Sequence, residues 1–164
     1  MQNIIKTSVD PALALLPLAM DTPNARVMLL AIGLQESRFT HRWQVLGGGL
    51  KGPARGFWQF ERGGGCTGVL SHAASRFWMH TVCGIRGCAP VPGQLWQAIE
   101  QDDVLAAAAA RLLLFTDPAR LPVVGDEAGA WALYMRVWRP GKPHLHTWPE
   151  LYARAVAAVA AGGA

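Results

Sequence analysis

The chain has 164 residues, a formal net charge of +4 at pH 7 and a pI of about 9.3. Apolar residues make up 51% of it and charged residues 16%, a composition that excludes a disordered chain and indicates one globular domain over residues 1–164. The excess of Lys and Arg favours an anionic partner, such as nucleic acid, a membrane surface or an acidic polymer.

Helix signals open the chain and fill its second half. A short helix is predicted over 10–20. A second, over 23–38, begins with Thr22 as its N-cap and Pro23 in its first turn. Later helices are predicted over 68–82, 92–101, 102–115, 127–138 and 148–161. Loops are expected over 84–93 and 117–126.

Glycine interrupts this helical pattern. Eight of the twenty-five residues from 41 to 65 are glycines, too many for a long helix, so this segment is expected to form loops or a small hairpin. The apolar run 12–20 is too short to cross a bilayer and contains Pro17. Because Asp10 takes the place of a basic segment before it, the run is also a poor signal peptide, and we expect synthesis in a cytoplasm.

Glu36 follows an unusually apolar helical segment. Residues 27–34 are apolar on every face, which predicts a buried central helix. Glu36 shares a face with Leu29 and Ile32, so it is expected where that helix leaves the core. Burial raises the pKa of a carboxyl group, and a carboxyl protonated near neutral pH can act as a general acid. The alternative is a solvated residue on the last helical turn.

Acidic residues are rare around Glu36. Between Thr22 and Ile99 the only carboxylates are Glu36 and Glu61, whereas the same span holds eight Lys or Arg residues. This distribution indicates a site for an anionic substrate that needs acid chemistry. A basic surface that only serves solubility is the alternative.

The three cysteines leave several states open. The chain has an odd number of cysteines, so at least one of them is unpaired within the chain; they are Cys66, Cys83 and Cys88. A zinc site with His72 or His80 is conceivable, but the spacing matches no strong metal motif. Free thiols and a Cys83–Cys88 bridge are the other two interpretations, and no metal or cofactor is predicted.

The motif "QESRF" (35–39), followed by "GPARGFWQF" (52–60), resembles the soluble lytic transglycosylase and goose-type lysozyme superfamily. In that family a helix ends in Glu-Ser, a loop reads Gly-Leu-Met-Gln, and a Tyr lies in an alanine-rich helix. Here the loop is Gly56-Phe57-Trp58-Gln59 and the Tyr is Tyr134. The resemblance spans about residues 24–140 and implies a lysozyme-like α+β fold.

The resemblance implies cleavage of the β-1,4 bond between N-acetylmuramic acid and N-acetylglucosamine in peptidoglycan. Glu36 would be the general acid, Tyr134 would hydrogen-bond near it, and Gln59 would bind an acetamido group. Ser37 would orient Glu36 or bind the peptide-bearing sugar. Phe57 and Trp58 would line the cleft, with Trp58 stacking on a sugar. For each of these residues an ordinary packing role is the alternative.

Glu61 leaves the outcome of the reaction open. It follows "WQF", where goose-type lysozymes place an Asp and most transglycosylases do not place an acid. With Glu36 alone, the muramic C6 hydroxyl closes a 1,6-anhydro ring. With Glu61 as base, water is activated and the enzyme is an inverting muramidase.

The chain also departs from the family. Met135-Arg136-Val137 replaces the Asn-Ala-Gly that follows the family's Tyr, and 62–93 has no counterpart that aligns. A catalytically inactive lysozyme-fold structural protein is one alternative function. A basic nucleic-acid-binding protein, which the pI and the seven Trp residues suggest, is the other.

A bacteriophage endolysin accords with the missing signal peptide, and so does a virion-borne enzyme that degrades the cell wall. We expect a monomer made in the host cytoplasm that acts on peptidoglycan glycan strands at the periplasmic cell wall and causes cytolysis. Neither nucleic-acid binding nor stable membrane association is expected.

Overall fold

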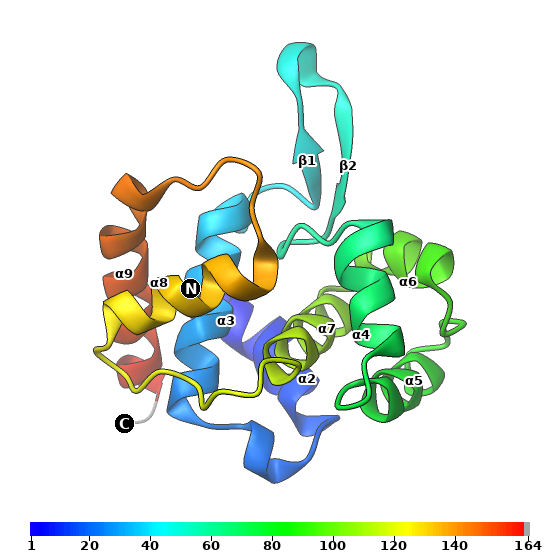
Figure 1. Ribbon diagram of the computed structural model, residues 1–164, viewed down its shortest axis with the longest axis horizontal. Helices are drawn as coiled ribbons and strands as arrows, with labels where there is room; N and C mark the ends of the chain where they lie inside the picture. The colour runs from blue at the N-terminus through cyan, green and yellow to red at the C-terminus, as the bar shows by residue number, and fades with distance from the viewer. Residues whose placement is uncertain (163–164) are drawn as a thin grey trace.

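The computed structural model describes residues 1–162, which form a mainly helical body with one two-stranded antiparallel sheet (Figure 1). The helices are α1 (Gln2–Ile4), α2 (Asp10–Ala14), α3 (Pro23–Ser37), α4 (Thr67–Ser71), α5 (Arg76–Ile85), α6 (Pro92–Ile99), α7 (Asp103–Phe115), α8 (Glu127–Trp138) and α9 (Trp148–Gly162). The strands are β1 (Trp43–Val45) and β2 (Lys51–Arg55). This architecture confirms the expected mainly α fold of the α+β type.

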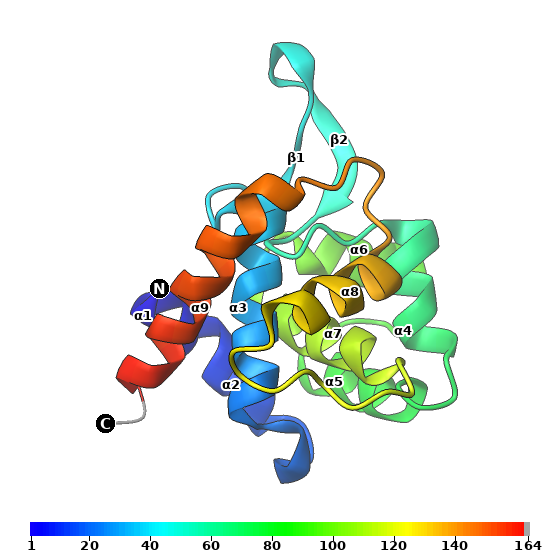
Figure 2. The ribbon, with the colours of Figure 1, turned by 60° about the vertical axis from the view of Figure 1, so that its left-hand side comes forward.

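The central helix is α3, as predicted. Thr22 caps it, because its hydroxyl accepts a hydrogen bond from Ala25 N at 3.2 Å, and Pro23 occupies the first turn. Residues 27–34 are all buried, and α3 packs against both α7 and α9 (Figure 2). The helix ends where Arg38 takes a left-handed backbone conformation with φ of 55°. Glu36 therefore lies in its last turn.

The second buried helix is α7. Asp102 caps it by accepting a hydrogen bond from Leu105 N at 2.9 Å. Five consecutive alanines, 106–110, are fully buried, and their small side chains allow close packing by α2, α3, α4, α5 and α6. Together α3 and α7 form the core around which the other helices lie.

Two predicted helices differ from the structure. Instead of one helix over 10–20, the chain is helical from Gln2 to Ala14, and Pro17 is extended with ψ of 137°. The predicted helix 68–82 is divided into α4 and α5, because His72 is extended between them. A buried hydrogen bond from Ser75 Oγ to Val69 O, at 2.8 Å, holds this turn. Within residues 1–162, no helix is both long and apolar enough to span a bilayer.

The predicted glycine-rich hairpin is present and projects from the helical body (Figures 1 and 2). Strands β1 and β2 pair Trp43 with Arg55 and Val45 with Lys51. Gly48 and Gly49 turn the tip with φ of 72° and 77°, a conformation that glycine adopts without a steric penalty.

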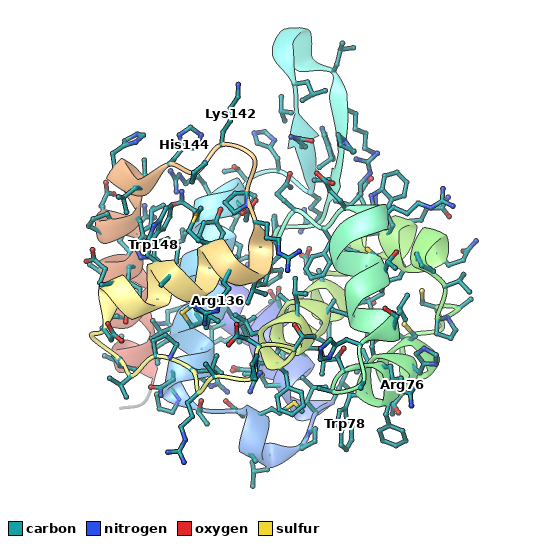
Figure 3. The ribbon with its side chains drawn as sticks, in the orientation of Figure 1. Arg76, Trp78, Arg136, Lys142, His144 and Trp148 are labelled. Carbon is teal, nitrogen blue, oxygen red and sulfur yellow. The ribbon has the colours of Figure 1, made fainter. Side chains whose placement is uncertain are left out.

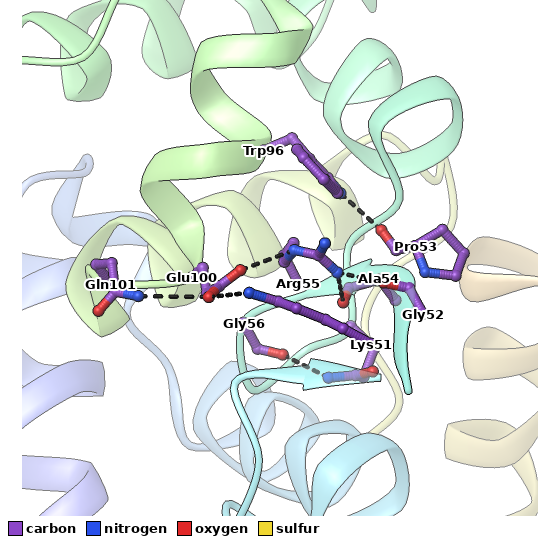
Figure 4. A network of polar contacts seen from close by, with 10 residues as sticks. Lys51, Gly52, Pro53, Ala54, Arg55, Gly56, Trp96, Glu100 and Gln101 are labelled. Carbon is purple, nitrogen blue, oxygen red and sulfur yellow. Dashed lines mark hydrogen bonds and ion pairs between the residues drawn. The ribbon is translucent and has the colours of Figure 1, made fainter. Parts of the chain in front are cut away.

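A polar network fixes the base of the hairpin to α6 (Figure 4). Glu100 accepts from Arg55 at 2.7 Å and from Lys51 at 2.5 Å. The Trp96 indole donates to Pro53 O at 2.7 Å, and the Arg55 guanidinium lies over the Trp96 ring, 4.2 Å from its centroid. These contacts hold the strand that leads to Gly56 and Gln59.

Candidate active site

A cavity of about 680 Å³ lies where the end of α3, the end of α8, the base of the hairpin and the segment 59–65 meet. Four of the residues proposed from the sequence line it together: Glu36, Gln59, Glu61 and Tyr134. Residues from the loop after α8 complete its wall. The cavity thus combines two carboxyl groups, an amide and a phenol, which is the kind of polar set that can protonate and orient a substrate.

Glu36 is the acid of this cavity. Its pKa is raised from 4.5 to about 7: burial is the largest cause, a hydrogen bond from Tyr134 opposes the shift, and the negative charge of Glu61 adds to it. Within residues 1–162, Glu36 forms no ion pair with Lys, Arg or His. Near neutral pH the carboxyl group is therefore about half protonated, which suits a general acid.

Tyr134 is held against Glu36 by two tryptophans. Its hydroxyl donates to Glu36 Oε1 at 2.6 Å, which confirms the contact expected between these residues. The phenol ring stacks on Trp148 at an interplanar angle of 14° and contacts Trp131, with both ring centroids 5.3 Å away. Burial and the charge of Glu36 raise the pKa of Tyr134, so the phenol stays protonated and acts as a donor.

Gln59 and Glu61 lie on the segment that follows the G-F-W-Q loop. Gln59 has φ of 51°, and its Nε2 donates to Gly56 O at 2.8 Å, which fixes the amide at the cavity wall. Glu61 is exposed at the rim of the cavity. Because its charge acts on the pKa of Glu36, the two carboxyl groups are electrostatically coupled.

Phe57 and Trp58 do not reach the cavity, so the expectation that they line the cleft and stack on a sugar is wrong for this structure. They are 3% and 0% exposed, and the Trp58 indole donates to Leu29 O on α3 at 2.8 Å. The physical reason is the loop geometry. Gly56, with φ of 71°, and Gln59 turn the chain so that both aromatic rings enter the core and Gln59 faces the cavity.

Ser37 lies beside the cavity and not in its wall. Its hydroxyl donates to Phe57 O at 2.7 Å and accepts from Phe39 N at 3.1 Å, and the side chain does not line the cavity. These contacts favour the first of the two expected roles of Ser37, orienting Glu36, over binding of the peptide-bearing sugar. Ser37 joins the end of α3 to the G-F-W-Q loop, and so fixes Glu36 relative to Gln59.

Left-handed backbone conformations gather around the cavity. The non-glycine residues with positive φ are Arg38, Phe39, Gln59 and Arg139 within residues 1–162, and each lies in a segment that borders Glu36 or lines the cavity. Such conformations cost about 1 kcal/mol or more each and persist where the surroundings impose them. Their position here is typical of a functional site.

Several cavity residues were not predicted from the sequence. Trp138 lines the wall, donates from its indole to Trp58 O at 3.0 Å and contacts Phe60 edge to face. Gln44 lines the cavity from the hairpin. Most residues of the loop after α8 line another part of its wall. The only sequence signal for that loop is its place directly after the helix that carries Tyr134, with Pro140-Gly141 ending the helical pattern.

A second cavity, of about 900 Å³, lies among the N-terminal helical segment, the start of α3 and the end of α9. Its aspartates are neutralised: Arg26 forms ion pairs with Asp10 at 2.5 Å and with Asp21 at 2.6 Å. It is larger than the first cavity but offers no acid comparable to Glu36.

The cysteines are free thiols in the structure. Burial raises the pKa of Cys66 and of Cys83 to about 12, so neither is a reactive thiolate at neutral pH. Within the described residues, no group of three or more His, Cys, Asp or Glu side chains is placed to hold a metal ion. The conceivable zinc site and the Cys83–Cys88 bridge are therefore not formed here.

Comparison with protein-family models, with curated proteins and with solved structures finds no match to the chain. A functional assignment therefore depends on the motifs and on the geometry of this cavity.

Proposed function

We propose that the protein is a glycosidase that cleaves the β-1,4 bond between N-acetylmuramic acid and N-acetylglucosamine in peptidoglycan. The observation that carries the proposal is the environment of Glu36. Its carboxyl group has a pKa of about 7, lines a cavity of about 680 Å³ and accepts a hydrogen bond from a buried tyrosine, Tyr134. The order of the Glu-Ser, G-x-x-Q and Tyr motifs supports it, because Glu36, Gln59 and Tyr134 line one cavity.

Glu36 performs the first step. The protonated carboxyl group gives its proton to the glycosidic oxygen as the bond from that oxygen to C1 of muramic acid breaks, and positive charge develops on the sugar ring. The resulting Glu36 carboxylate is stabilised by the hydrogen bond from Tyr134. Gln59, whose Nε2 donates to Gly56 O, would bind an acetamido group of the sugar in this proposal.

In the transglycosylase reaction, the C6 hydroxyl of the same muramic acid attacks C1. The Glu36 carboxylate takes the hydroxyl proton, and the product carries a 1,6-anhydro ring. This route uses one carboxyl group as acid and then as base, so it needs no contribution from Glu61.

Hydrolysis with inversion is the second candidate, and the position of Glu61 favours it. An inverting pair of carboxyl groups is separated by about 6.5–9.5 Å, which leaves room for a water molecule. Glu61 lines the same cavity as Glu36 and is close enough for its charge to raise the pKa of Glu36. As general base, Glu61 would take a proton from water while the oxygen attacks C1, which gives a reducing end.

Clearing of a peptidoglycan suspension tests the proposal. Wild-type protein is expected to clear it, and Glu36→Gln is expected to clear it at least ~100-fold more slowly, because a general acid contributes about that much or more. Glu150→Gln is the matched control, since Glu150 is an exposed carboxylate on α9. Absence of clearing by the wild type, together with tight and salt-sensitive DNA binding, would instead support the nucleic-acid-binding alternative.

A further inference from the structure

The loop after α8 presents positive charge to the candidate active site. Arg139, Lys142 and His144 all line the cavity, and Figure 3 shows Lys142 and His144 on this stretch, which we call the 139–144 loop. Within residues 1–162, none of the three forms an ion pair, whereas Arg42 and Arg55 of the neighbouring hairpin segment pair with Asp103 and Glu100. The cavity therefore has acids on one wall and, among the described residues, two cations without an ion-pair partner, Arg139 and Lys142, on another.

Hydrogen bonds hold the 139–144 loop in place. At its start, Trp138 donates to Trp58 O at 3.0 Å and Arg139 takes a left-handed conformation with φ of 50°. At its end, Gln35 Nε2 donates to His144 O at 3.2 Å, and Thr147 Oγ1 donates to Gln35 Oε1 at 3.1 Å. Because Gln35 directly precedes Glu36, the basic loop is tied to the helical turn that carries the candidate acid.

We infer that the 139–144 loop binds carboxylates of the peptide attached to muramic acid, so that the substrate is peptide-bearing glycan and not bare glycan. The inference rests on the proposed function. In peptidoglycan the sugar chain is uncharged where its lactyl group is amide-linked, and the negative charge belongs to the attached peptide. Arg139 and Lys142 can donate hydrogen bonds to neutral sugars as well, but only the peptide carboxylates also match their charge.

The energetic size of this recognition is modest. Each contact between exposed charges raises the affinity by at most about fivefold, and this gain falls as the salt concentration rises. Arg139 and Lys142 together are therefore expected to give a preference of about tenfold for peptide-bearing strands at low salt. At high salt the preference is expected to fall.

The decisive experiment compares kcat/KM on two substrates: soluble glycan strands that carry their peptides, and the same strands after an amidase has removed the peptides. Wild type is expected to prefer the peptide-bearing strands by about tenfold, and the R139Q/K142Q double variant to lose most of that preference. Glutamine suits the left-handed position, since Gln59 adopts one. The conservative variant K142R is expected to keep the preference.

The matched control is R76Q/R120Q, which removes the same charge from exposed arginines that do not line the cavity. Figure 3 shows Arg76 on α5, away from the 139–144 loop. This control is expected to keep the wild-type ratio of kcat/KM on peptide-bearing strands to kcat/KM on peptide-free strands. Equal kcat/KM of the wild type on both strands, or an unchanged ratio in R139Q/K142Q, would overturn the inference while cleavage itself upholds the proposed function.

A binding measurement covers the case in which the wild type cleaves neither strand, which would refute the proposed function. Glu36→Gln protein is applied to beads that carry the peptide-bearing strands and to beads that carry the peptide-free strands. Retention that needs both the peptides and Arg139 and Lys142 supports peptide recognition by the loop. Equal retention on both kinds of beads, or binding of a DNA oligonucleotide through the same two residues without dependence on the peptides, overturns it.

Discussion

The Tyr134 hydroxyl donates a hydrogen bond of 2.6 Å to Glu36 Oε1 across 98 residues of sequence. This contact joins α8 to the end of α3 and places a fixed donor on the candidate acid. The hydrogen bond favours the carboxylate and so lowers the pKa of Glu36, but burial has the larger effect and brings it to about 7. The balance between the two can be changed by single substitutions.

Replacing Tyr134 by Phe removes the donor and should raise the pKa of Glu36 above 7, because the carboxylate loses its hydrogen bond. The alkaline limb of the pH–rate profile, where a general acid loses its proton, should move to higher pH. Tyr152→Phe is the control, since Tyr152 accepts a hydrogen bond from Gly125 N and lies outside the cavity. An alkaline limb that stays in place in Tyr134→Phe would argue against the coupling.

Replacing Glu61 by Gln should have the opposite effect on the pKa of Glu36. The negative charge of Glu61 raises that pKa, so its removal should move the alkaline limb to lower pH. Mass spectrometry of the products separates the two reaction routes. Reducing ends that vanish in Glu61→Gln indicate an inverting hydrolase, whereas anhydro ends that persist indicate a transglycosylase.

Burial of Glu36 should make stability depend on pH. Its pKa is about 7 in the folded protein and 4.5 for a fully solvated Glu side chain, so the folded state binds more protons between these pH values and its stability falls as pH rises from about 4.5 to 7. The full shift corresponds to about 3 kcal/mol, and partial exposure of Glu36 reduces this to roughly 1–2 kcal/mol.

Denaturant unfolding of wild type and Glu36→Gln at pH 5 and pH 8 measures this effect. The variant lacks the titrating group. The difference in the free energy of unfolding, variant minus wild type, should therefore be larger at pH 8 than at pH 5, which means that the variant is relatively more stable at pH 8. A difference that is the same at both pH values would mean that Glu36 keeps an ordinary pKa in the folded protein.

Replacing Gly33 by Ala should disturb the packing of the residues that follow Glu36. A Cβ atom at Gly33 would overlap the Phe39 ring, which folds back over α3 and contacts the rings of Phe57 and Trp58. The expected cost is about 1–3 kcal/mol in the free energy of unfolding, as in other overpacked cores. Activity should fall as well, because Ser37 and Phe57 lie in the displaced region.

Gly84→Ala is the matched control for Gly33→Ala. Gly84 lies on the exposed face of α5, and a Cβ atom there meets nothing within 4 Å. Since Ala is the better helix former by about 1 kcal/mol, this substitution should be neutral or stabilising. If both substitutions behave alike, the overlap at Phe39 does not determine the effect.

The central helix could be predicted because its signals are local and strong. The Thr22-Pro23 cap and the unbroken apolar run 27–34 predict a buried helix, and Glu36 follows it directly. The hydrogen bond from Tyr134 to Glu36 was expected only from the resemblance of the motifs to those of the lytic transglycosylase and goose-type lysozyme superfamily, and the structure contains this bond.

The places of Phe57, Trp58 and Ser37 could not be predicted because backbone conformation decides them. A Trp suits either a core or a sugar-binding surface, and the left-handed turn at Gln59 that buries Trp58 has no counterpart in residue type. The 139–144 loop was missed for a related reason: a loop has no periodicity, so nothing in its sequence indicates which cavity it borders.

The N-terminal segment shows how tertiary contacts override propensity. Ile5–Val9 contains β-branched residues with modest helix propensity and was not predicted to be helical. In the structure Ile5 and Val9 are buried, and this segment packs against α7, which stabilises the helical conformation.

Mass spectrometry of purified peptidoglycan treated with wild type, Glu36→Gln and Glu150→Gln tests the central claim most directly, because it counts the new sugar ends that each protein makes. Wild type and Glu150→Gln should release new muramic ends at the same rate, and Glu36→Gln should release them at least ~100-fold more slowly. New ends released by Glu36→Gln at the wild-type rate would contradict the assignment of Glu36 as the catalytic acid.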